Sequence, residues 1–358
     1  DIVFGDWSSD VCSSDLIPVA LPQIEKELNR FWRRQAQSED RAVLRASTLT
    51  LIIITRSEEQ YQSGLQAFPD LINHHPGRII MVRQGVATAG GQVEGFISAH
   101  CQLAHPGGRQ LCCEQITLLC PPEQEWTLHG ILLPLLLPDL PVFLWWPEEP
   151  GVSLQPLQSL WSFIDRLIIN SSRLQGTWQD FRRTCDALAR LHGQVLVTDL
   201  GWSGVTNWRE AMARCFDAPA GTAWLDGMER VRLTFSRPGQ RAAGYWLLAW
   251  LATLLDWQSA DAAVPVFSRS GRTIIIDQLV EEAAEEQGLW RVELFAQLDG
   301  QKRRYSITRQ GQERLTIDDG EREIEWRSPV SPDGELMCRE LDMAGGDELF
   351  QRICRFMV

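Results

Sequence analysis

The chain has 358 residues, of which 44% are hydrophobic and 23% are charged, and its formal net charge is −13. Its length and composition predict a folded protein of two domains, each large enough for its own hydrophobic core. The acidic excess disfavours nucleic acid and anionic membrane surfaces as partners, because both repel negative charge. No uninterrupted apolar run reaches the roughly 18 to 20 residues that a membrane span needs, so we expect a soluble, cytoplasmic protein.

The first sixteen residues stand apart from the rest. Residues 6–16, rich in Ser and Asp, match the translation of a widely used sequencing-adapter oligonucleotide. We therefore expect residues 1–16 to be either such an artefact or a disordered leader, and we leave them out of the fold prediction.

Strand and helix patterns alternate up to about residue 200. Apolar residues recur at helical spacing after Pro22, whereas β-branched runs that are apolar on both faces predict buried strands. In chain order we predict a helix to Gln37, a strand at Ser47–Thr55, a helix from Ser57 to Asn73, strands at Arg78–Val82, Val93–Leu103 and Gln110–Cys120, a helix at Glu125–Leu137, a strand at Pro141–Trp146, a break at Pro147–Gly151, a strand at Arg166–Ile169, a helix at Thr177–His192 and a strand at Gln194–Asp199. This alternation predicts an α/β domain with a mixed sheet over residues 17–200.

A different pattern follows residue 200. Helices are predicted at Asn207–Phe216 and Gln240–Trp257, with a short strand at Val231–Phe235 between them. Short alternating runs separated by Asp-Gly and Gln-Gly turns then predict an antiparallel meander, with strands at Thr273–Ile276, Arg291–Leu298, Arg303–Thr308, Arg314–Ile317 and Glu321–Arg327. A last amphipathic helix at Asp347–Met357 is expected to pack on that sheet. Residues 201–358 are thus predicted to form a helical segment and an α+β C-terminal domain.

Common catalytic signatures do not occur in the sequence. It has neither the Gly-x-Gly-x-x-Gly fingerprint of a dinucleotide site nor the Gly-x-x-x-x-Gly-Lys loop that cradles phosphates. The Gly-x-Ser-x-Gly pattern of a serine nucleophile is also missing. We therefore predict a protein without catalytic residues and without a bound cofactor.

A zinc-binding module is one alternative for the segment between residues 100 and 120. Potential zinc ligands gather there on two strands that we expect to be adjacent: His100, Cys101, His105, Cys112, Cys113 and Cys120. However, no Cys-x-x-Cys pair occurs, and Cys112 and Cys113 should point to opposite faces of one strand. Reduced, buried thiols are therefore favoured over a metal site.

Two carboxylates stand out because each lies within or beside an apolar strand. Glu114 needs a cationic or hydrogen-bonding partner if it is buried, and Arg78 is the candidate. An outward-facing Glu114 is the equal alternative, and an acid/base pair with His75 ranks below both. Asp199, at the carboxyl end of a strand, either marks a ligand crevice or caps the helix that follows, and capping is favoured.

Several of these residues recur in one ordered pattern that runs from about Leu21 to the C-terminus. It comprises His75, Pro76 and Arg78, then Glu114 and Gln115, then the run from Leu135 to Pro147 with Asp139, Trp145 and Trp146, and finally Asp199, Trp202, Trp208, Arg209 and Glu210. The pattern resembles that of the glucose-6-phosphate dehydrogenase assembly protein family, OpcA. Gly77 is a departure, because the family pattern has Cys or another small residue there.

The resemblance implies a non-catalytic activator or assembly factor that binds the oligomer of glucose-6-phosphate dehydrogenase in the oxidative pentose phosphate pathway, and it implies that the pattern residues are candidate interaction positions. Such an activator has to bind one conformational state of its partner more tightly than the other. For cyanobacterial members the resemblance also implies redox regulation by thioredoxin through cysteines, and the sequence does not choose among Cys101, Cys112, Cys113, Cys120, Cys185, Cys215, Cys338 and Cys354. The alternative is a sugar-phosphate-binding α/β protein, or an enzyme, that uses a crevice near Asp199 and Arg209.

Overall fold

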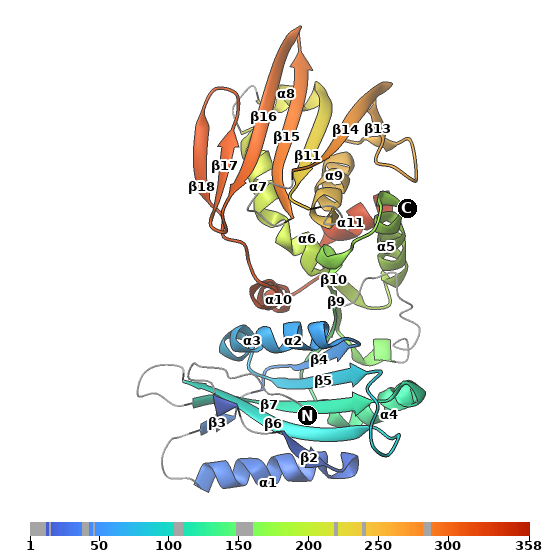
Figure 1. Ribbon diagram of the computed structural model, residues 1–358, viewed down its shortest axis with the longest axis vertical. Helices are drawn as coiled ribbons and strands as arrows, with labels where there is room; N and C mark the ends of the chain where they lie inside the picture. The colour runs from blue at the N-terminus through green and yellow to red at the C-terminus, as the bar shows by residue number, and fades with distance from the viewer. Residues whose placement is uncertain are drawn as a thin grey trace.

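A computed structural model describes residues 12–13, 16–37, 43–45, 47–103, 110–147, 160–217, 221–237, 241–281 and 288–358. They form two mixed β-sheets, each with helices packed on it (Figure 1). The predicted class, two parts that each combine helices with a sheet, is confirmed at that level. Most of the predicted leader, His105 and the predicted break after Pro147 lie outside the described residues. Among the described residues, no helix combines the length and the apolar character that crossing a bilayer requires.

The first sheet has ten strands. They are β1 (Cys12–Ser13), β2 (Ile17–Val19), β3 (Val43–Arg45), β4 (Thr50–Thr55), β5 (Arg78–Gln84), β6 (Glu94–Leu103), β7 (Gln110–Cys120), β8 (Val142–Trp146), β9 (Arg166–Ile169) and β10 (Leu196–Asp199). Parallel strands follow the order β7-β5-β4-β8-β9-β10, and β6 pairs antiparallel with β7 as the predicted hairpin. This is the strand order of doubly wound dinucleotide-binding sheets, whose ligand crevice lies at the carboxyl ends of the strands where the order reverses.

Helices cover both faces of this sheet. Those that precede β10 are η1 (Leu21–Gln23), α1 (Ile24–Gln37), α2 (Glu58–Gln66), α3 (Phe68–His74), η2 (Pro122–Thr127), α4 (Leu128–Leu132), η3 (Leu133–Leu135), η5 (Ser171–Arg173) and α5 (Trp178–Leu191). Alternate residues of β4 face opposite layers, because Ile52 belongs to the buried cluster that includes residues of α1, α4 and α5, whereas Ile53 belongs to a separate cluster that includes residues of α2 and α3. The apolar character of both faces of the predicted strand is thus explained.

Prolines divide two helices that the sequence analysis predicted as continuous. The predicted helix from Ser57 to Asn73 is two helices, α2 and α3, because Pro69 lies in the first turn of α3 and supplies no N–H for an earlier helix to continue. The predicted helix at Glu125–Leu137 is one short α-helix flanked by 3₁₀ turns, and Pro134 lies in the second of these turns.

The second sheet has eight strands in the order β12-β13-β14-β11-β15-β16-β17-β18. They are β11 (Met228–Phe235), β12 (Gln258–Ser259), β13 (Phe267–Arg269), β14 (Arg272–Val280), β15 (Leu289–Leu298), β16 (Gln301–Gln310), β17 (Arg314–Asp318) and β18 (Glu323–Arg327). From β15 to β18 the strands pair antiparallel in chain order. In contrast to the predicted meander, β14 lies parallel to β11, because β11 inserts between β14 and β15.

The remaining helices follow β10 in the chain. They are α6 (Leu200–Gly204), α7 (Thr206–Arg214), α8 (Gly221–Asp226), α9 (Ala242–Leu254), α10 (Asp333–Asp342) and α11 (Glu348–Phe356). The prediction that the last helix packs on the second sheet is wrong. Phe350 of α11 instead contacts Trp202 of α6 and Trp246 of α9, and α11 lies against α5 and α9.

Helix α10 follows the second sheet in the chain but packs on α3 and α6, beside the first sheet (Figure 1). Its buried Leu336, Met337 and Leu341 join the cluster that contains Ile53 of β4 and Leu71 of α3. The sequence analysis missed this helix, because the Pro-Asp-Gly segment at its start is typical of a turn.

Candidate functional site

Arg78, at the start of β5, is the centre of a buried ion-pair cluster. Its side chain is 2% exposed, and that of Glu114 beside it on β7 is 1% exposed. Arg78 Nε donates to Glu114 Oε2 at 2.8 Å, and Arg78 Nη1 donates to the carbonyl oxygen of Leu135, also at 2.8 Å. Glu25 of α1 accepts two further bonds from the guanidinium. The predicted pairing of Glu114 with Arg78 is confirmed, and the outward-facing alternative is wrong.

This cluster joins α1, β5, β7 and the segment before β8. Trp32 of α1 donates from Nε1 to Glu114 Oε1 at 2.6 Å, so both carboxylate oxygens have a donor. Burial lowers the pKa of Arg78, but its contacts with Glu25 and Glu114 outweigh that effect and the net shift is upward. A charged pair whose donors and acceptors are used in this way fixes the packing of α1 on the sheet.

His75 and Pro76, the first two pattern residues, lie away from Glu114. The Nε2 atom of His75 lies 3.2 Å from the carbonyl oxygen of Cys338 and 3.4 Å from Oδ1 of Asp342, at the far end of α10. Pro76 accepts a bond from Thr48 N at 2.7 Å, which aligns the start of β4. The acid/base pair of His75 and Glu114 is therefore not formed.

Gly77, where this chain departs from the family pattern, lies against the backbone of the neighbouring strand. A Cβ atom at this position would lie 2.6 Å from the carbonyl oxygen of Leu49, so any side chain here requires that strand to shift. The N–H of Gly77 donates to the Cys113 sulfur at 3.4 Å. Gln115, the next pattern residue, contacts His100 through Oε1, and burial lowers the pKa of His100.

The run from Leu135 to Pro147 forms core structure, not an exposed anchor. Asp139 is exposed and has φ of 63°, a left-handed conformation that Asp tolerates in turns. Trp145 is 0% exposed and Trp146 is 1% exposed, and the two rings pack on opposite faces of the first sheet. Their contribution is hydrophobic burial.

Cys101 and Cys112 form a disulfide between β6 and β7. They stand directly opposite each other in register, with Cα atoms 4.0 Å apart. The expectation that all thiols are reduced is therefore wrong at this pair. The zinc alternative loses two ligands, because zinc binds the thiolate and both sulfurs are used in the bridge. Within the described residues no group of His, Cys, Asp and Glu could hold a metal ion.

Six further cysteines have free thiols and are buried: Cys113, Cys120, Cys185, Cys215, Cys338 and Cys354. Burial raises the pKa of Cys113 to about 11 and that of Cys215 to about 12. Since the thiolate is the reactive form, these thiols are inert near neutral pH.

Both carboxylate oxygens of Asp199, at the end of β10, accept hydrogen bonds from neighbouring residues of the protein. Its Oδ1 accepts from Ser171 N at 2.8 Å and from Gly201 N at 2.9 Å, and its Oδ2 accepts from Ser171 Oγ at 2.5 Å. Burial raises the pKa of Asp199 to about 6, against the lowering effect of these bonds. The predicted capping role is confirmed, because Asp199 is the N-cap of α6.

The last group of pattern residues surrounds Trp202 of α6. The guanidinium of Arg209 lies 3.5 Å from the Trp202 ring, and Trp202 Nε1 donates to Asp347 Oδ2 at 2.7 Å. Burial lowers the pKa of Arg209 to about 10, so the group stays charged near neutral pH. Trp208 is buried, and Glu210 is exposed. This group joins α6, α7 and the start of α11.

The pattern residues do not converge on one site. Arg78 lies at the amino end of a parallel strand, whereas Asp199 lies at the carboxyl end of another. Most of them are buried, and Arg78, Glu114, Gln115, Asp199 and Trp202 are also hydrogen-bonded within the chain, so they contribute to the packing of the fold.

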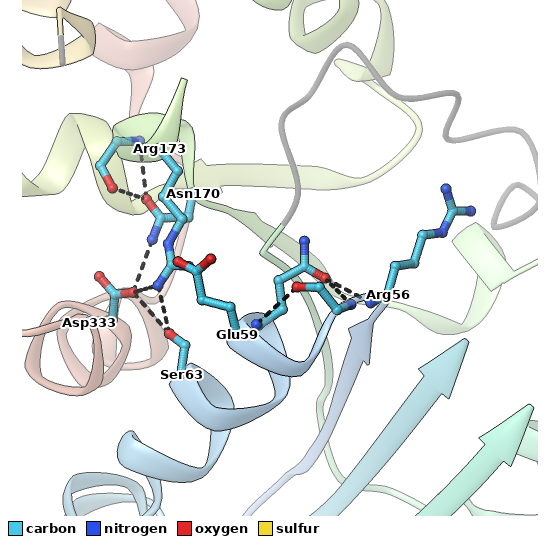
Figure 2. Close-up of polar contacts among 9 residues, drawn as sticks. Arg56, Glu59, Ser63, Asn170, Arg173 and Asp333 are labelled. Atoms are coloured by element: carbon cyan, nitrogen blue, oxygen red, sulfur yellow. Dashed lines mark hydrogen bonds and ion pairs between the residues drawn. The ribbon is translucent and has the colours of Figure 1, made fainter. Parts of the chain in front are cut away.

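A polar cluster that the sequence analysis missed lies beside the carboxyl ends of β4 and β9 (Figure 2). Asp333, the first residue of α10, accepts from Asn170 Nδ2 at 3.1 Å and from Ser63 Oγ at 3.5 Å. Arg173 donates to Ser63 Oγ at 2.9 Å and lies 3.3 Å from Glu59 and 3.6 Å from Asp333. The cluster joins α2, η5 and α10. Its one sequence signal is that Asn170 directly follows a predicted buried strand.

The other end of α10 is held by Arg166, at the start of β9. Its Nη2 donates to the carbonyl oxygens of Met343 at 2.5 Å and Gly345 at 2.9 Å, and its Nη1 donates to that of Glu340. A guanidinium at this position satisfies the carbonyl groups that the last helical turn leaves without partners. Helix α10 is thus fixed at both ends to the first sheet.

The turn between β4 and α2 does not fit a dinucleotide. Ser57 and Gln60 form a capping box, in which Gln60 N donates to Ser57 Oγ at 3.2 Å and Ser57 N donates to Gln60 Oε1 at 3.3 Å. Glu58 and Glu59 place two carboxylates in the first turn of α2. In doubly wound sheets this turn is rich in glycine and binds the pyrophosphate on free N–H groups. Here the cap uses the N–H groups of Ser57 and Gln60, and the carboxylates of Glu58 and Glu59 are paired with Arg83 and Arg173.

Two family descriptions match this chain, one for each terminal domain of a protein described as a glucose-6-phosphate dehydrogenase subunit. The description of the N-terminal domain matches residues 69–190, and that of the C-terminal domain matches residues 195–354. Together they span most of the chain and meet just before β10.

Relatives with the name OxPP cycle protein OpcA are similar to part of the chain. That of Synechocystis sp. is 28% identical over 166 residues, which are 46% of this chain and 34% of that protein. That of Nostoc punctiforme is 29% identical over 167 residues, which are 46% of this chain and 35% of that protein. The match thus spans about a third of the length of these relatives.

Solved structures of oxidoreductases are only weakly similar to this chain. An oxidoreductase domain protein from Kribbella flavida has a TM-score of 0.42 at 12% identity, covering 87% of this chain and 91% of that chain. A myo-inositol dehydrogenase from Lactobacillus casei has a TM-score of 0.42 at 10% identity, covering 86% and 91%. These scores are too low to carry an argument about activity.

Proposed function

We propose that this chain, which belongs to the OpcA family of glucose-6-phosphate dehydrogenase subunits, is a non-catalytic assembly factor and activator of glucose-6-phosphate dehydrogenase. Both family descriptions name that enzyme, and together they match residues 69–190 and 195–354. The relatives in Synechocystis and Nostoc are named for the OxPP cycle, that is, the oxidative pentose phosphate pathway. On this proposal the chain acts in the cytoplasm together with the enzyme it binds.

The turn between β4 and α2 is the observation that carries the non-catalytic part of the proposal. The strand order of the first sheet is that of a dinucleotide-binding fold, and this turn is where such a fold binds the pyrophosphate. The capping box of Ser57 and Gln60 and the carboxylates of Glu58 and Glu59 occupy that position. A hydride-transfer enzyme needs the cofactor that this turn disfavours.

Activation by such a protein follows from differential binding. If the dehydrogenase exists in a more active and a less active state, a partner shifts the population only by as much as its affinities for the two states differ. A tenfold preference for the active state contributes about 1.4 kcal/mol to that state. The effect requires no catalytic group in this chain.

A titration into purified glucose-6-phosphate dehydrogenase tests the proposal. We expect the chain alone to reduce no NADP and to lower the glucose 6-phosphate concentration at which the enzyme reaches half of its maximal rate. Light scattering should show a larger complex at the same protein concentrations. If neither the rate nor the size of the oligomer changes, the proposed function is wrong.

A redox response is the second candidate function, and the Cys101–Cys112 disulfide favours it. Cys101 is partly exposed, whereas Cys112 is buried. A dithiol reductant such as thioredoxin would convert the bridge to two thiols and would itself be oxidised to a disulfide. The test compares activation of the dehydrogenase by the oxidised chain, the reduced chain and a Cys101→Ser/Cys112→Ser variant. We expect the variant to behave like the reduced chain. Equal activation by all of them would rule out this switch.

A sugar-phosphate site near Asp199 and Arg209 has weaker support. The carboxylate of Asp199 uses both oxygens on Ser171 and Gly201, and Arg209 is stacked on Trp202. Calorimetry of the isolated chain with glucose 6-phosphate separates the two functions, because only this alternative requires ligand binding without the enzyme.

A further inference from the structure

The second sheet has one face on which none of the described helices packs. Helices α7, α8 and α9 lie on the face that contains Leu233 and Phe235, and Gly244 of α9 lies directly against these side chains. Side chains that alternate with these along the strands point to the opposite face. We call this the open face, and its residues are Thr273, Ile275, Asp277, Leu279, Arg230, Arg232, Thr234, Arg291, Glu293, Phe295, Gln297, Lys302, Arg304, Ser306, Thr308, Arg314, Thr316, Asp318, Glu323, Glu325 and Arg327.

A continuous chain of ion pairs runs across the open face. From β14 and β11 to β17 its nitrogen–oxygen distances lie between 2.8 and 3.6 Å, and its members are Arg230, Asp277, Arg232, Glu293, Arg304 and Asp318. The pairs hold these guanidinium groups on the sheet surface before any partner arrives. Less side-chain entropy is then lost when a partner binds, which favours association.

The charge of the open face differs in sign from that of the whole chain. Its basic side chains outnumber its acidic ones, although the whole chain has a net charge of −13. Lys302 is one of only two lysines in the sequence, so the basic charge is almost entirely arginine. Ile275 and Leu279 are exposed on the same face, at 45% and 41%. A surface that combines arginine with exposed apolar side chains is typical of a protein interface.

The open face approaches the area that one partner contributes to a specific interface. Neighbouring strands lie about 4.8 Å apart, so the six strands from β14 to β18 are about 24 Å wide, and an average strand length of about 25 Å gives on the order of 600 Å² of flat area. Each partner of a stable complex contributes about 800 Å² of accessible surface. A broad, flat surface also fits a second sheet face better than it fits a single helix.

The charge selects the kind of partner. A second copy of this chain on a two-fold axis would place the same basic surface against itself, which like charges disfavour. From the charge, the preorganised arginines and the area, we infer that the open face binds glucose-6-phosphate dehydrogenase through a broad, acidic surface of that enzyme. This inference rests on the proposed function, and it adds the surface and the sign of charge by which the partner is recognised.

A charge-reversal variant tests the open face. The variant Arg291→Glu/Lys302→Glu changes two open-face residues that take no part in the ion pairs between β14 and β17, so those ion pairs are retained. The matched control is Arg183→Glu/Arg190→Glu on α5, where the side chains are 67% and 77% exposed, because it changes the net charge equally on another surface. Binding to immobilised dehydrogenase is measured by surface plasmon resonance, and activation by the rate assay. Circular dichroism of both variants tests whether they are folded.

We expect the open-face variant to raise the Kd roughly tenfold or more and the control to change it less than about twofold. Added salt should slow association of the wild type more than that of the open-face variant. Hydrogen exchange of the wild type gives a second measurement: binding should protect β15 and β16 and leave α5 unchanged, whether or not the variant folds.

The outcomes separate this inference from the proposed function. If the wild type binds the enzyme and the open-face variant binds equally well, the inference is wrong and the proposed function stands. If the wild type neither binds nor activates the enzyme, both are wrong. If the variant loses only self-association in light scattering, the occupant is a second copy and the inference is overturned.

Discussion

Replacing Glu114 by Gln tests whether the buried cluster around Arg78 holds α1 and β7 together. The change removes the charge that pairs with Arg78, whose side chain is 2% exposed, but it keeps an oxygen that can accept from Trp32. Removing one partner of a buried ion pair costs about 3 to 5 kcal/mol. Arg78 retains Glu25 and the carbonyl oxygen of Leu135, so we expect a loss near the lower limit, about 3 kcal/mol.

Urea unfolding followed by circular dichroism measures this loss. With a slope of about 3 kcal/mol per molar urea, the midpoint should fall by about 1 M. The matched control is Glu25→Gln, which makes the same chemical change to a carboxylate that is 46% exposed, and it should cost about 1 kcal/mol or less. If the variants at Glu114 and Glu25 lose equal stability, the reasoning from burial is wrong.

Three further perturbations test other contacts. Because burial raises the pKa of Asp199 from 3.8 to about 6, its contribution to stability is most favourable below pH 4 and is lost as the pH rises through 6. The free energy of unfolding of Asp199→Asn should therefore gain about 2.4 kcal/mol relative to wild type between pH 4 and pH 7, and a constant difference would contradict the assignment. Reducing the Cys101–Cys112 bridge, with a sequence separation of 11 residues, should lower the free energy of unfolding by about 3 kcal/mol in urea titrations with and without reductant, whereas thiol labelling of both cysteines in unreduced protein would refute the bridge. Gly77→Ala should cost about 1 to 3 kcal/mol in thermal unfolding because of the Leu49 carbonyl, while Gly90→Ala, which meets nothing within 4 Å, should not; equal losses would disprove the steric argument.

The sequence predicts those parts of the structure that local pattern and burial determine. Strands β4 and β8 were located from runs that are apolar on both faces, and both lie inside the first sheet. The pairing of Glu114 with Arg78 was predicted because a buried carboxylate needs a partner, and a cation lay nearby in the pattern. These are arguments about single segments and their chemistry.

Contacts between segments far apart in the sequence could not be predicted from local patterns. The Cys101–Cys112 bridge depends on the exact register of β6 and β7, which a hairpin prediction does not fix. Asp333 meets Asn170 across 163 residues and Ser63 across 270 residues, so no local signal places them together. Helix α10 itself was missed because its first residues are typical of a turn.

Helix α10 imposes an order on the synthesis of the protein. The last strand of the first sheet ends at Asp199, but α10, which packs on α3 and α6 and joins the buried cluster of Ile53 and Leu71, ends at Asp342. At about 5 to 20 residues per second, roughly 140 residues of further translation leave the apolar side of α3 that α10 covers exposed for about 7 to 30 s. During this interval the nascent chain presents a surface that chaperones recognise, and the N-terminal half completes its core only when the C-terminal half has left the ribosome.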